Sequence, residues 1–184
     1  PNLAMARCYA GTVMLEGTTL SEGRGTTRPL ELFGAPDLDA GALLARMATL
    51  APDWLAGCRL RPCWFEPTFH KHAGRLCQGL QIHVDDPAYD HARFRPWRLQ
   101  ALAFKALRQL RPDYPLWRDF PYEYEQGRLA IDLINGGPLL REWVDDAPDK
   151  RGKQRQEVTV TACFAPLLQW VLGWWTGDEK RLAL

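Results

Sequence analysis

The feature that most limits how this chain can fold is an early segment rich in glycine, threonine and serine, residues 16–27. This composition favours neither a helix nor a strand, and the glycines permit the positive backbone angles found in loops. The segment before it, residues 8–15, is apolar, and we predict that it forms a buried strand. The fold must therefore be built around an irregular loop close to its first element.

Two further segments have the pattern of strands. Residues 78–84 alternate apolar and polar side chains, which places Gln81 and His83 on the polar face of a strand. Residues 54–66 also look extended, and Pro62 marks an edge strand or a bend there.

Three segments have helical patterns, with a polar cap or a proline at the start and apolar residues at helical spacing. The expected helices run from Asp37 or Asp39 to about Leu50, from Pro96 to Leu110, and from Pro138 to Val144. Strands mixed with about three helices, without regular alternation of strand and helix, favour an α+β fold.

Length and charge exclude several classes of protein. A chain of 184 residues suits one domain of above-average size, or a domain with an appendage. Lys plus Arg total 23 and Asp plus Glu total 22, so a nucleic-acid partner is not expected. The longest apolar run, residues 166–175, is about half the length that crosses a bilayer, and no signal-peptide pattern opens the sequence. Because the first residue is Pro1, we expect a piece of a longer chain.

The cysteines are odd in number and form no C-x-x-C pair. They are Cys8, Cys58, Cys63, Cys77 and Cys163. An odd count fits a disulfide framework poorly, so reduced and mostly buried thiols in a cytoplasmic protein are the default expectation. Export as part of a larger protein stays open.

The glycine-rich segment is the first candidate site. Glu16 or Glu22 can act as an acid, a base or a charge stabiliser, and Arg24 can hold a carboxylate or phosphate through two parallel hydrogen bonds. The segment is neither a Walker A loop nor a dinucleotide fingerprint. A structural loop whose hydroxyls satisfy its own backbone explains the composition equally well, so the residues alone leave both interpretations open.

The histidines give a weaker signal. His70 and His72 lie two apart in an expected loop, and with His83 and Glu66 or Asp85 they have the chemistry of metal ligands. Such sets are common by chance, so we expect neither a metal nor a cofactor. His83 points away from the apolar face of its strand, where a ligand or a structural partner can satisfy it.

The run LEGTTLSEGRGTTRP, residues 15–29, is long and unusual, and we refer to it as the signature loop. Other matches follow it in order: Glu31, residues 34–36, residues 65–69, residues 77–86, residues 131–136, and residues 140–141. Together with Pro1-Asn2, these motifs resemble the signature of the NamZ-type exo-β-N-acetylmuramidases, a bacterial family long known only as a domain of unknown function. The resemblance covers about residues 1–145, and one long loop with ordered downstream matches is far more specific than a single motif.

The resemblance implies a glycosidase that removes N-acetylmuramic acid from the non-reducing end of peptidoglycan fragments during cell-wall turnover and recycling. Family proteins are about twice as long as this chain. They have a Rossmann-like N-terminal domain, a smaller barrel-like C-terminal domain, and an active site in the cleft between the two. We therefore expect residues 1–146 to form the C-terminal, substrate-cleft domain and residues 147–184 to be a divergent tail. The expected sheet is mixed, mainly antiparallel and barrel-like, with about three helices packed on it.

The resemblance also implies which residues line the cleft. They are Glu16, Ser21, Glu22, Arg24, Thr26, Thr27, Gln81 and His83. Arg24 is expected to pair with the lactyl carboxylate of muramic acid, and Glu16 and Glu22 are the catalytic candidates or hold sugar hydroxyls or water. Thr19 stands where the family has asparagine. Because glycosidases typically use two carboxylates and the N-terminal half with its presumed acid is missing, we expect the chain alone to be inactive.

The expected partners are a muropeptide or N-acetylmuramic acid glycoside and the missing N-terminal Rossmann-like domain, with no nucleic acid and no membrane. A cytoplasmic and a periplasmic location both stay open. The main alternative is a non-catalytic domain that binds glycan or pairs with a separate N-terminal partner, which predicts binding without turnover. A second alternative, a misfolded fragment of a truncated gene, predicts that the chain does not fold cooperatively.

Overall fold

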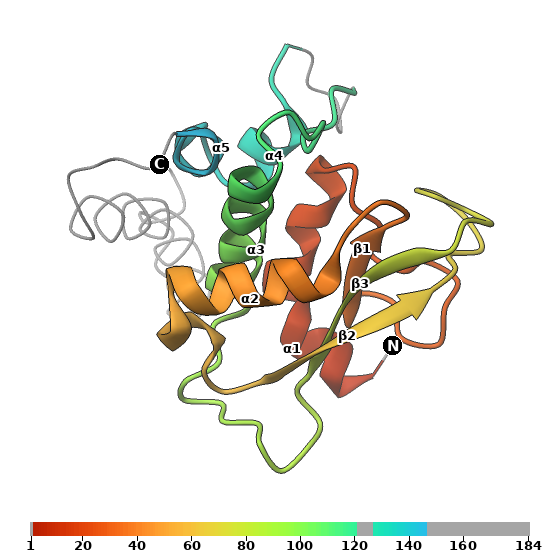
Figure 1. The fold of residues 1–184 in the computed structure, drawn as a ribbon, viewed down its shortest axis with the longest axis vertical. Helices are drawn as coiled ribbons and strands as arrows, with labels where there is room; N and C mark the ends of the chain where they lie inside the picture. Colours follow the sequence, from red (N-terminus) through yellow and green to blue (C-terminus); the bar gives the residue numbers. More distant parts are fainter. Residues whose placement is uncertain (1, 121–126, 147–184) are drawn as a thin grey trace, which may run out of the picture. The chain divides into compact units, whose positions relative to one another are not determined.

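The computed structural model describes residues 2–120 and 127–146, and the chain divides into two compact units, Pro1–Arg118 and Asp119–Leu184 (Figure 1). The first unit contains α1 (Leu3–Thr12), the 3-10 helix η1 (Val13–Gly17), β1 (Leu32–Ala35), α2 (Ala40–Leu50), the 3-10 helix η2 (Pro52–Leu55), β2 (Arg59–Phe65), β3 (Cys77–His83) and α3 (Pro96–Leu110). The second unit contains α4 (Ala130–Ile134) and α5 (Leu139–Asp145). The expected α+β class is confirmed.

The sheet is a small antiparallel sheet in the order β1-β3-β2, with β3 in the centre. The strand expected at residues 78–84 is confirmed as β3, where buried Leu80 and Ile82 alternate with Gln81 and His83. Pro62 lies on the edge strand β2, as predicted, and a proline is tolerated there because an edge leaves some N–H positions unpaired.

The expected barrel is wrong for the described residues. Three strands cannot close on themselves, and β1 spans only four residues. The signature loop lies along the outer edge of β1 instead, where Ser21 and Gly34 exchange two backbone hydrogen bonds of 2.8 and 3.0 Å. The described residues also form five α-helices rather than about three.

The strand predicted at residues 8–15 is also wrong, because this segment forms the second half of α1 and the start of η1. Asn2 caps α1 by accepting a hydrogen bond of 2.7 Å from the backbone N–H of Met5. Gly11 then allows α1 to lie directly against the start of α3: a Cβ atom at this position would sit 2.1 Å from the carbonyl oxygen of Pro96. A short apolar run has no periodicity that separates a buried helix from a buried strand.

The other two large helices follow the predicted pattern. Asp39 caps α2, accepting a hydrogen bond of 2.9 Å from Ala42 N–H, and α3 begins at Pro96 as expected. Leu110 is 41% exposed, so the buried stripe of α3 ends before the helix does. Figure 1 shows α1 and α3 side by side with α2 crossing them, next to the strands. The largest fully buried side chains include Phe33, Phe104, Met14, Leu15, Leu20, Leu43, Met47 and Leu80.

Residues 54–66 are extended only in part, because Pro52–Leu55 is a 3-10 turn and β2 begins at Arg59. In the second unit, Pro138 precedes α5 as its N-cap, close to the predicted start. Arg141 holds Asp132 through hydrogen bonds of 2.8 and 2.9 Å, which joins α5 to α4. The predicted tail, residues 147–184, lies outside the described residues. No helix among the described residues is long and apolar enough to span a membrane.

Candidate functional site

The signature loop is fixed at its start by the segment that follows α3. Thr19 N–H donates to the carbonyl of Leu116 at 2.8 Å, and Arg118 N–H donates to the carbonyl of Gly17 at 3.0 Å. These bonds hold η1, which carries Glu16, against a segment far away in the sequence. Glu16 is therefore placed by tertiary contacts rather than by the loop alone.

The middle of the signature loop contacts the loop between β2 and β3, residues 66–76, which we call the β2–β3 loop. Thr68 N–H donates to the carbonyl of Arg24 at 3.0 Å. Gly25 has a φ of +81°, and a Cβ atom there would fall 1.7 Å from the hydroxyl of Thr68. Glycine at this position thus gives both the left-handed backbone and the close approach between the two loops.

Two carboxylates of the signature loop meet in a group of charged residues. We call this group the charged cluster; its members are Glu16, Glu22, Arg24, His70, Lys71 and Arg118. Glu22 is 1% exposed; one of its oxygens accepts from Arg24 Nε, and the other lies 2.8 Å from Lys71 Nζ. Glu16 lies 3.3 Å from Arg24 Nη2 and 4.0 Å from Arg118 Nη1. One guanidinium therefore bridges both carboxylates.

The β2–β3 loop supplies the cluster's other members. His70 Nδ1 is 3.5 Å from Glu22 and its Nε2 is 4.0 Å from Glu16, so the imidazole lies between the two carboxylates. The Lys71 ammonium also donates to the carbonyls of Leu15 at 2.6 Å and Thr18 at 3.2 Å. The side chain of Lys71 is only 8% exposed. Two carbonyl oxygens and one carboxylate thus surround this buried ammonium, and burial of a charge requires such partners.

The electrostatics of the cluster keep Glu22 ionised. Burial works to raise its pKa, but the charge and hydrogen bonds of Lys71 and Arg24 outweigh burial, and the pKa is lowered from its ordinary value. Burial lowers the pKa of Lys71, and the carboxylates of Glu22 and Glu16 oppose that shift. Burial works to lower the pKa of Arg24, yet its bonds to Glu22 and its attraction to Glu16 raise it. The guanidinium therefore stays charged.

The accessible side of the cluster is formed by Arg24 and His70 rather than by the carboxylates. The two carboxylates contact three basic side chains, those of Arg24, Lys71 and Arg118. The carboxylate side chains are 2% and 23% exposed, whereas those of Arg24 and His70 are 41% and 37% exposed. Such an arrangement presents cationic donors to solvent and keeps the carboxylates behind them, which suits the binding of an anionic group.

A metal ion fits this donor set poorly. One ligand atom each from Glu16, Glu22 and His70 lie within 4.8 Å of one another, and their types are suitable. The ammonium of Lys71 and the guanidinium of Arg24 already hold the same carboxylate oxygens, however, and they would repel a divalent cation. We assign no metal to the cluster.

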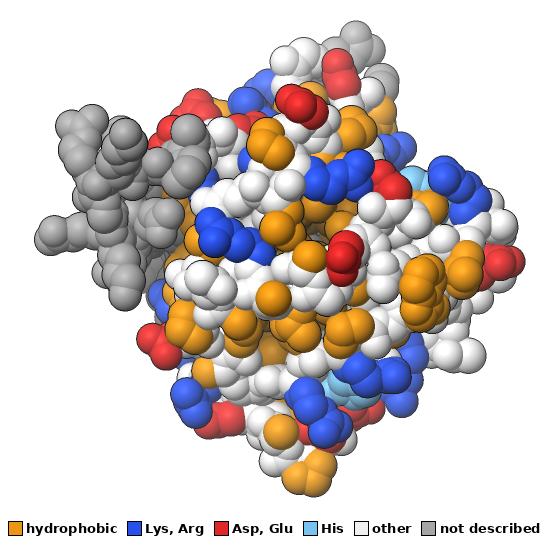
Figure 2. All heavy atoms as spheres, in the orientation of Figure 1, with side chains coloured by type: hydrophobic (Ala, Val, Ile, Leu, Met, Phe, Trp, Pro, Cys, Tyr) orange, Lys and Arg blue, Asp and Glu red, His pale blue; other side chains and the backbone are white. Residues whose placement is uncertain are grey.

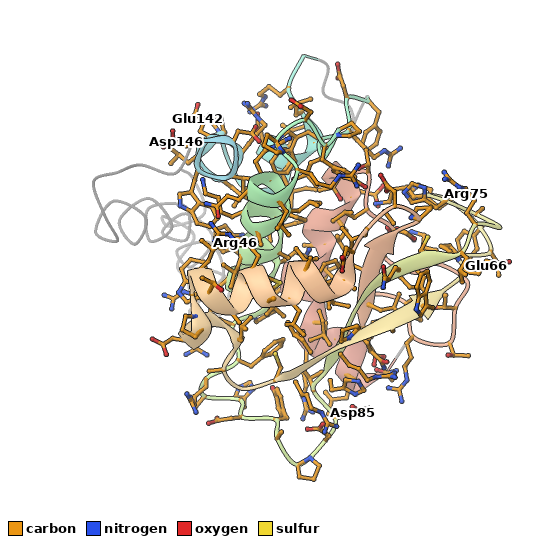
Figure 3. All side chains as sticks on the ribbon, viewed as in Figure 1. Arg46, Glu66, Arg75, Asp85, Glu142 and Asp146 are labelled. Atoms are coloured by element: carbon orange, nitrogen blue, oxygen red, sulfur yellow. The ribbon has the colours of Figure 1, made fainter. Side chains whose placement is uncertain are left out.

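The structure also separates the residues that the sequence grouped as metal candidates. Figure 3 shows Glu66 at one end of β2 and β3 and Asp85 at the opposite end. Asp85 pairs with Arg28 at 2.9 Å, while His70 faces Glu16 and Glu22 instead. On the face drawn in Figure 2, basic and acidic side chains are interspersed rather than gathered by sign.

Other predicted site residues lie at or away from the cluster. Ser21 accepts a hydrogen bond from Gly23 N–H at 3.1 Å, and Thr26 donates to the carbonyl of Gly23 at 2.7 Å, so these hydroxyls serve the loop's own backbone. Thr27 is exposed.

Gln81 and His83 lie on β3 beside Arg61. The guanidinium of Arg61 donates to Gln81 Oε1 at 2.6 Å and to His83 Nε2 at 3.4 Å. In the part of the chain that the structure describes, no hydrogen bond or ion pair joins either residue to the charged cluster. The structure thus brings Glu16, Glu22 and Arg24 together and leaves Gln81 and His83 on a separate patch of the sheet.

Sequence reasoning overlooked Lys71 and Arg118 and attached His70 to the wrong partners. Lys71 lies between His70 and His72, which have the chemistry of metal ligands. The available signal was a lone lysine in a loop that directly follows the matched segment 65–69. Arg118 follows α3 in an aromatic loop and carried no signal of its own.

The described cysteines are free thiols and lie outside the cluster. Burial, together with the nearby charge of Glu31, raises the pKa of Cys8 to about 12. Burial raises the pKa of Cys58 to about 12 and that of Cys77 to about 11. Thiols of this kind are poor nucleophiles, since the thiolate is the reactive form. Cys163 lies outside the described residues.

Comparison with known proteins gives consistent matches. Residues 7–161 match the family described as exo-β-N-acetylmuramidase NamZ, C-terminal, and this match continues past the boundary that we predicted at residue 146. The peptidoglycan β-N-acetylmuramidase NamZ of Bacillus subtilis (strain 168) is 43% identical over 86 residues, which are 47% of this chain and 20% of that protein.

Two crystal structures of DUF1343 family proteins from Bacteroides fragilis NCTC 9343 are also similar. The first has a TM-score of 0.60 and 22% identity, and the match covers 82% of this chain and 36% of that protein. The second has a TM-score of 0.49 and 18% identity, and the match covers 89% of this chain and 41% of that protein. The first likeness supports the fold, and this chain spans well under half the length of each protein it matches.

Proposed function

Because the chain belongs to the family of C-terminal domains of exo-β-N-acetylmuramidase NamZ, we propose that it is the substrate-binding part of such a glycosidase. The whole enzyme would release N-acetylmuramic acid from the non-reducing end of peptidoglycan fragments. The Bacillus subtilis relative is named a peptidoglycan β-N-acetylmuramidase, and this chain spans 20% of its length. A preceding Rossmann-like domain is part of the proposal.

The exposed guanidinium of Arg24 carries this proposal. N-acetylmuramic acid differs from N-acetylglucosamine by a lactyl group that ends in a carboxylate. A guanidinium recognises a carboxylate through parallel N–H donors, and Arg24 is both held by Glu22 and 41% exposed. The exposed side chains of Arg24 and His70, with the carboxylates behind them, favour the same acidic sugar. Phe69, which precedes His70 and is 55% exposed, offers a ring face against which a sugar can pack.

The two carboxylates are assigned to positioning and charge rather than to acid catalysis. A glycosidase needs one carboxyl group that is protonated and can donate to the leaving oxygen. Glu22, whose pKa is lowered, stays ionised near neutrality and is nearly closed off from solvent. Glu16, whose side chain is 23% exposed, is the carboxylate that can reach a sugar hydroxyl or water. The catalytic acid is then supplied by the N-terminal domain.

Binding to the two sugars tests the role of Arg24. Titration of the chain with N-acetylmuramic acid and with N-acetylglucosamine, followed by NMR, should show a preference for the acidic sugar. Arg24→Ala should reduce that preference by about tenfold, which corresponds to about 1.4 kcal/mol. Arg111→Ala, which removes an exposed arginine paired with Asp37, is the matched control and should change nothing. Equal preference in Arg24→Ala and the unaltered chain would exclude this role.

Hydrolysis of a chromogenic β-N-acetylmuramide tests the division of labour. The chain alone should be silent, and adding the N-terminal half of a relative should restore turnover. Activity of the chain alone would place the catalytic groups among its own residues, with Glu16 the first suspect, and would overturn the two-domain account.

A second candidate function is a non-catalytic domain that binds glycan or pairs with a separate partner. The observation that favours it is that all four carboxylate oxygens of Glu16 and Glu22 face cationic side chains or His70. This alternative predicts a cooperative unfolding transition and sugar binding, with no turnover even after the N-terminal half is added.

A further inference from the structure

Lys71 is a buried charged residue of the β2–β3 loop that contacts the signature loop. Its ammonium reaches Leu15 O at 2.6 Å, Thr18 O at 3.2 Å and Glu22 Oε2 at 2.8 Å. The first two contacts are hydrogen bonds and the third is an ion pair. Leu15 and Thr18 enclose the turn that carries Glu16. Lys71 therefore contacts the Glu22 carboxylate and the backbone of the turn that carries Glu16.

The contacts of Glu22 extend this effect to Arg24. Lys71 occupies Glu22 Oε2, which leaves Oε1 to accept from Arg24 Nε. Arg24 then reaches Glu16 with Nη2 at 3.3 Å. The rotamer of Glu22 is thus set from behind by Lys71, and the direction of the guanidinium is set by Glu22.

The backbone of the β2–β3 loop is shaped to make this contact. His70 and His72, on either side of Lys71, have φ angles of +68° and +58°, which are uncommon for residues with a side chain. Such angles persist only where the surroundings hold them. Here the ring of His72 contacts the carbonyl of Thr19 at 2.8 Å, and Gly74 N–H donates to the carbonyl of Pro67 at 2.8 Å.

We propose that Lys71 is a positioning residue that holds Glu22 and the Glu16 turn in place and, through Glu22, aims the Arg24 guanidinium at the acidic group of the ligand. The identity of that ligand rests on the proposed function. The positioning itself is a property of this chain alone, and it can be measured without any ligand.

The first test follows the titration of the Glu22 carboxyl carbon by NMR in Lys71→Met and Lys71→Arg. The charged or titratable groups that face Glu22 are Lys71, Arg24 and His70; Glu16 and Arg118 lie behind them. All variants should carry His70→Gln, so that no imidazole lies beside Glu22 during the titration.

Lys71→Met should move the Glu22 midpoint upward, since burial remains while its main opposing charge is gone. Lys71→Arg should leave the midpoint low. Arg28→Met removes a cation from another buried carboxylate, Glu31, and is the matched control that should not move Glu22. An unchanged Glu22 midpoint in a folded Lys71→Met protein would overturn the proposal.

The second test measures the preference for N-acetylmuramic acid over N-acetylglucosamine between pH 5 and 7. Lys71→Met should lose about tenfold of that preference. The loss should grow toward pH 5 as Glu22 becomes protonated and releases Arg24. Lys71→Arg should keep most of the preference. If Lys71→Met has the same sugar preference and the same pH profile as the unaltered chain, the positioning role is contradicted.

A double variant covers the case in which Lys71→Met does not fold. Lys71→Met with Glu22→Gln removes both charges of the pair and leaves no unpaired carboxylate. It should fold and yet lose preference for the acidic sugar as Arg24→Ala does; binding like that of the unaltered chain would overturn the proposal. If the unaltered chain binds neither sugar, the proposed function fails, while the Glu22 titration still decides the role of Lys71.

Discussion

Glu22 and Glu31 are two carboxylates of one segment, both 1% exposed, and their surroundings differ. Glu22 lies among Lys71, Arg24 and His70, and two of these side chains reach solvent. Glu31 accepts from Asn2 Nδ2 at 2.8 Å and from Arg28 Nη1 at 2.9 Å. Burial alone therefore does not distinguish the two.

The difference lies in which side chains surround each carboxylate. Around Glu31, one guanidinium serves two carboxylates, because Arg28 also pairs with Asp85 at 2.9 Å. Asn2 caps α1, and Asp85 follows β3 closely, so this network ties the start of the first helix to the end of the central strand. The charged groups of this network pair with one another. The charged cluster turns Arg24 and His70 toward solvent and keeps Glu16 and Glu22 behind them, which leaves it able to take an anionic ligand.

The largest expected effect comes from breaking the buried pair at Glu22. Lys71→Met should lower the free energy of unfolding by about 3 kcal/mol, because it takes from a buried carboxylate one of the two cations that contact it. Adding Glu22→Gln should recover at least about 1 kcal/mol, since partners in contact are not additive. Urea denaturation of the two single variants and the double variant measures the coupling. Strictly additive losses would show that the pair contributes nothing.

The next largest effect comes from separating the two loops that build the cluster. Gly25→Ala should cost about 2 kcal/mol, because alanine is strained at φ +81° and its Cβ would overlap Thr68. Gly74→Ala is the matched control: Gly74 has a φ of +70°, and a Cβ atom there would meet nothing within 4 Å, so only the backbone strain applies. Equal losses of stability in the two variants would mean that the contact between the loops is not needed.

The network at Glu31 should give a smaller effect and no change in binding. Arg28 is 42% exposed, so Arg28→Met should cost about 1 kcal/mol of stability despite the burial of its partner. Binding of N-acetylmuramic acid should stay as in the unaltered chain. Weaker binding in a protein of nearly unchanged stability would mean that the second network also faces the ligand.

Sequence patterns predicted the parts of the fold that depend on local rules. Leu80 and Ile82 alternate with polar neighbours in β3, Asp39 caps α2, and Pro96 begins α3. The first helix was missed because residues 8–15 are apolar without a clear period. The deciding features, the Asn2 cap and the close approach of Gly11 to α3, lie outside that run or depend on tertiary packing.

The candidate site was predictable only as far as one loop reaches. Glu16, Glu22 and Arg24 share the signature loop, and the sequence placed them together. Lys71 donates to Leu15 across 56 residues of chain, and no local pattern shows that the β2–β3 loop folds back onto η1. Expected site residues on β3 failed to join the cluster for a related reason. Arg61 on the neighbouring strand already holds the side chains of Gln81 and His83.

The smallest effect expected is a difference in acid stability between the two networks. The pKa of Glu22 is lowered from its ordinary value of 4.5, so its stabilising contribution is complete above that value and is lost as the pH falls through the folded pKa. Hydrogen bonding to Arg28 lowers the pKa of Asp85 from 3.8 in the same direction, but Asp85 is exposed.

Denaturation between pH 3 and 7 should therefore show a weaker acid dependence in Glu22→Gln and in Asp85→Asn than in the unaltered chain. In 1 M salt, where the screening length is about 3 Å, the contribution of exposed Asp85 should vanish and that of buried Glu22 should persist. If salt removes both equally, then Glu22 is reached by solvent ions, and the contrast between a shielded carboxylate and an exposed one disappears.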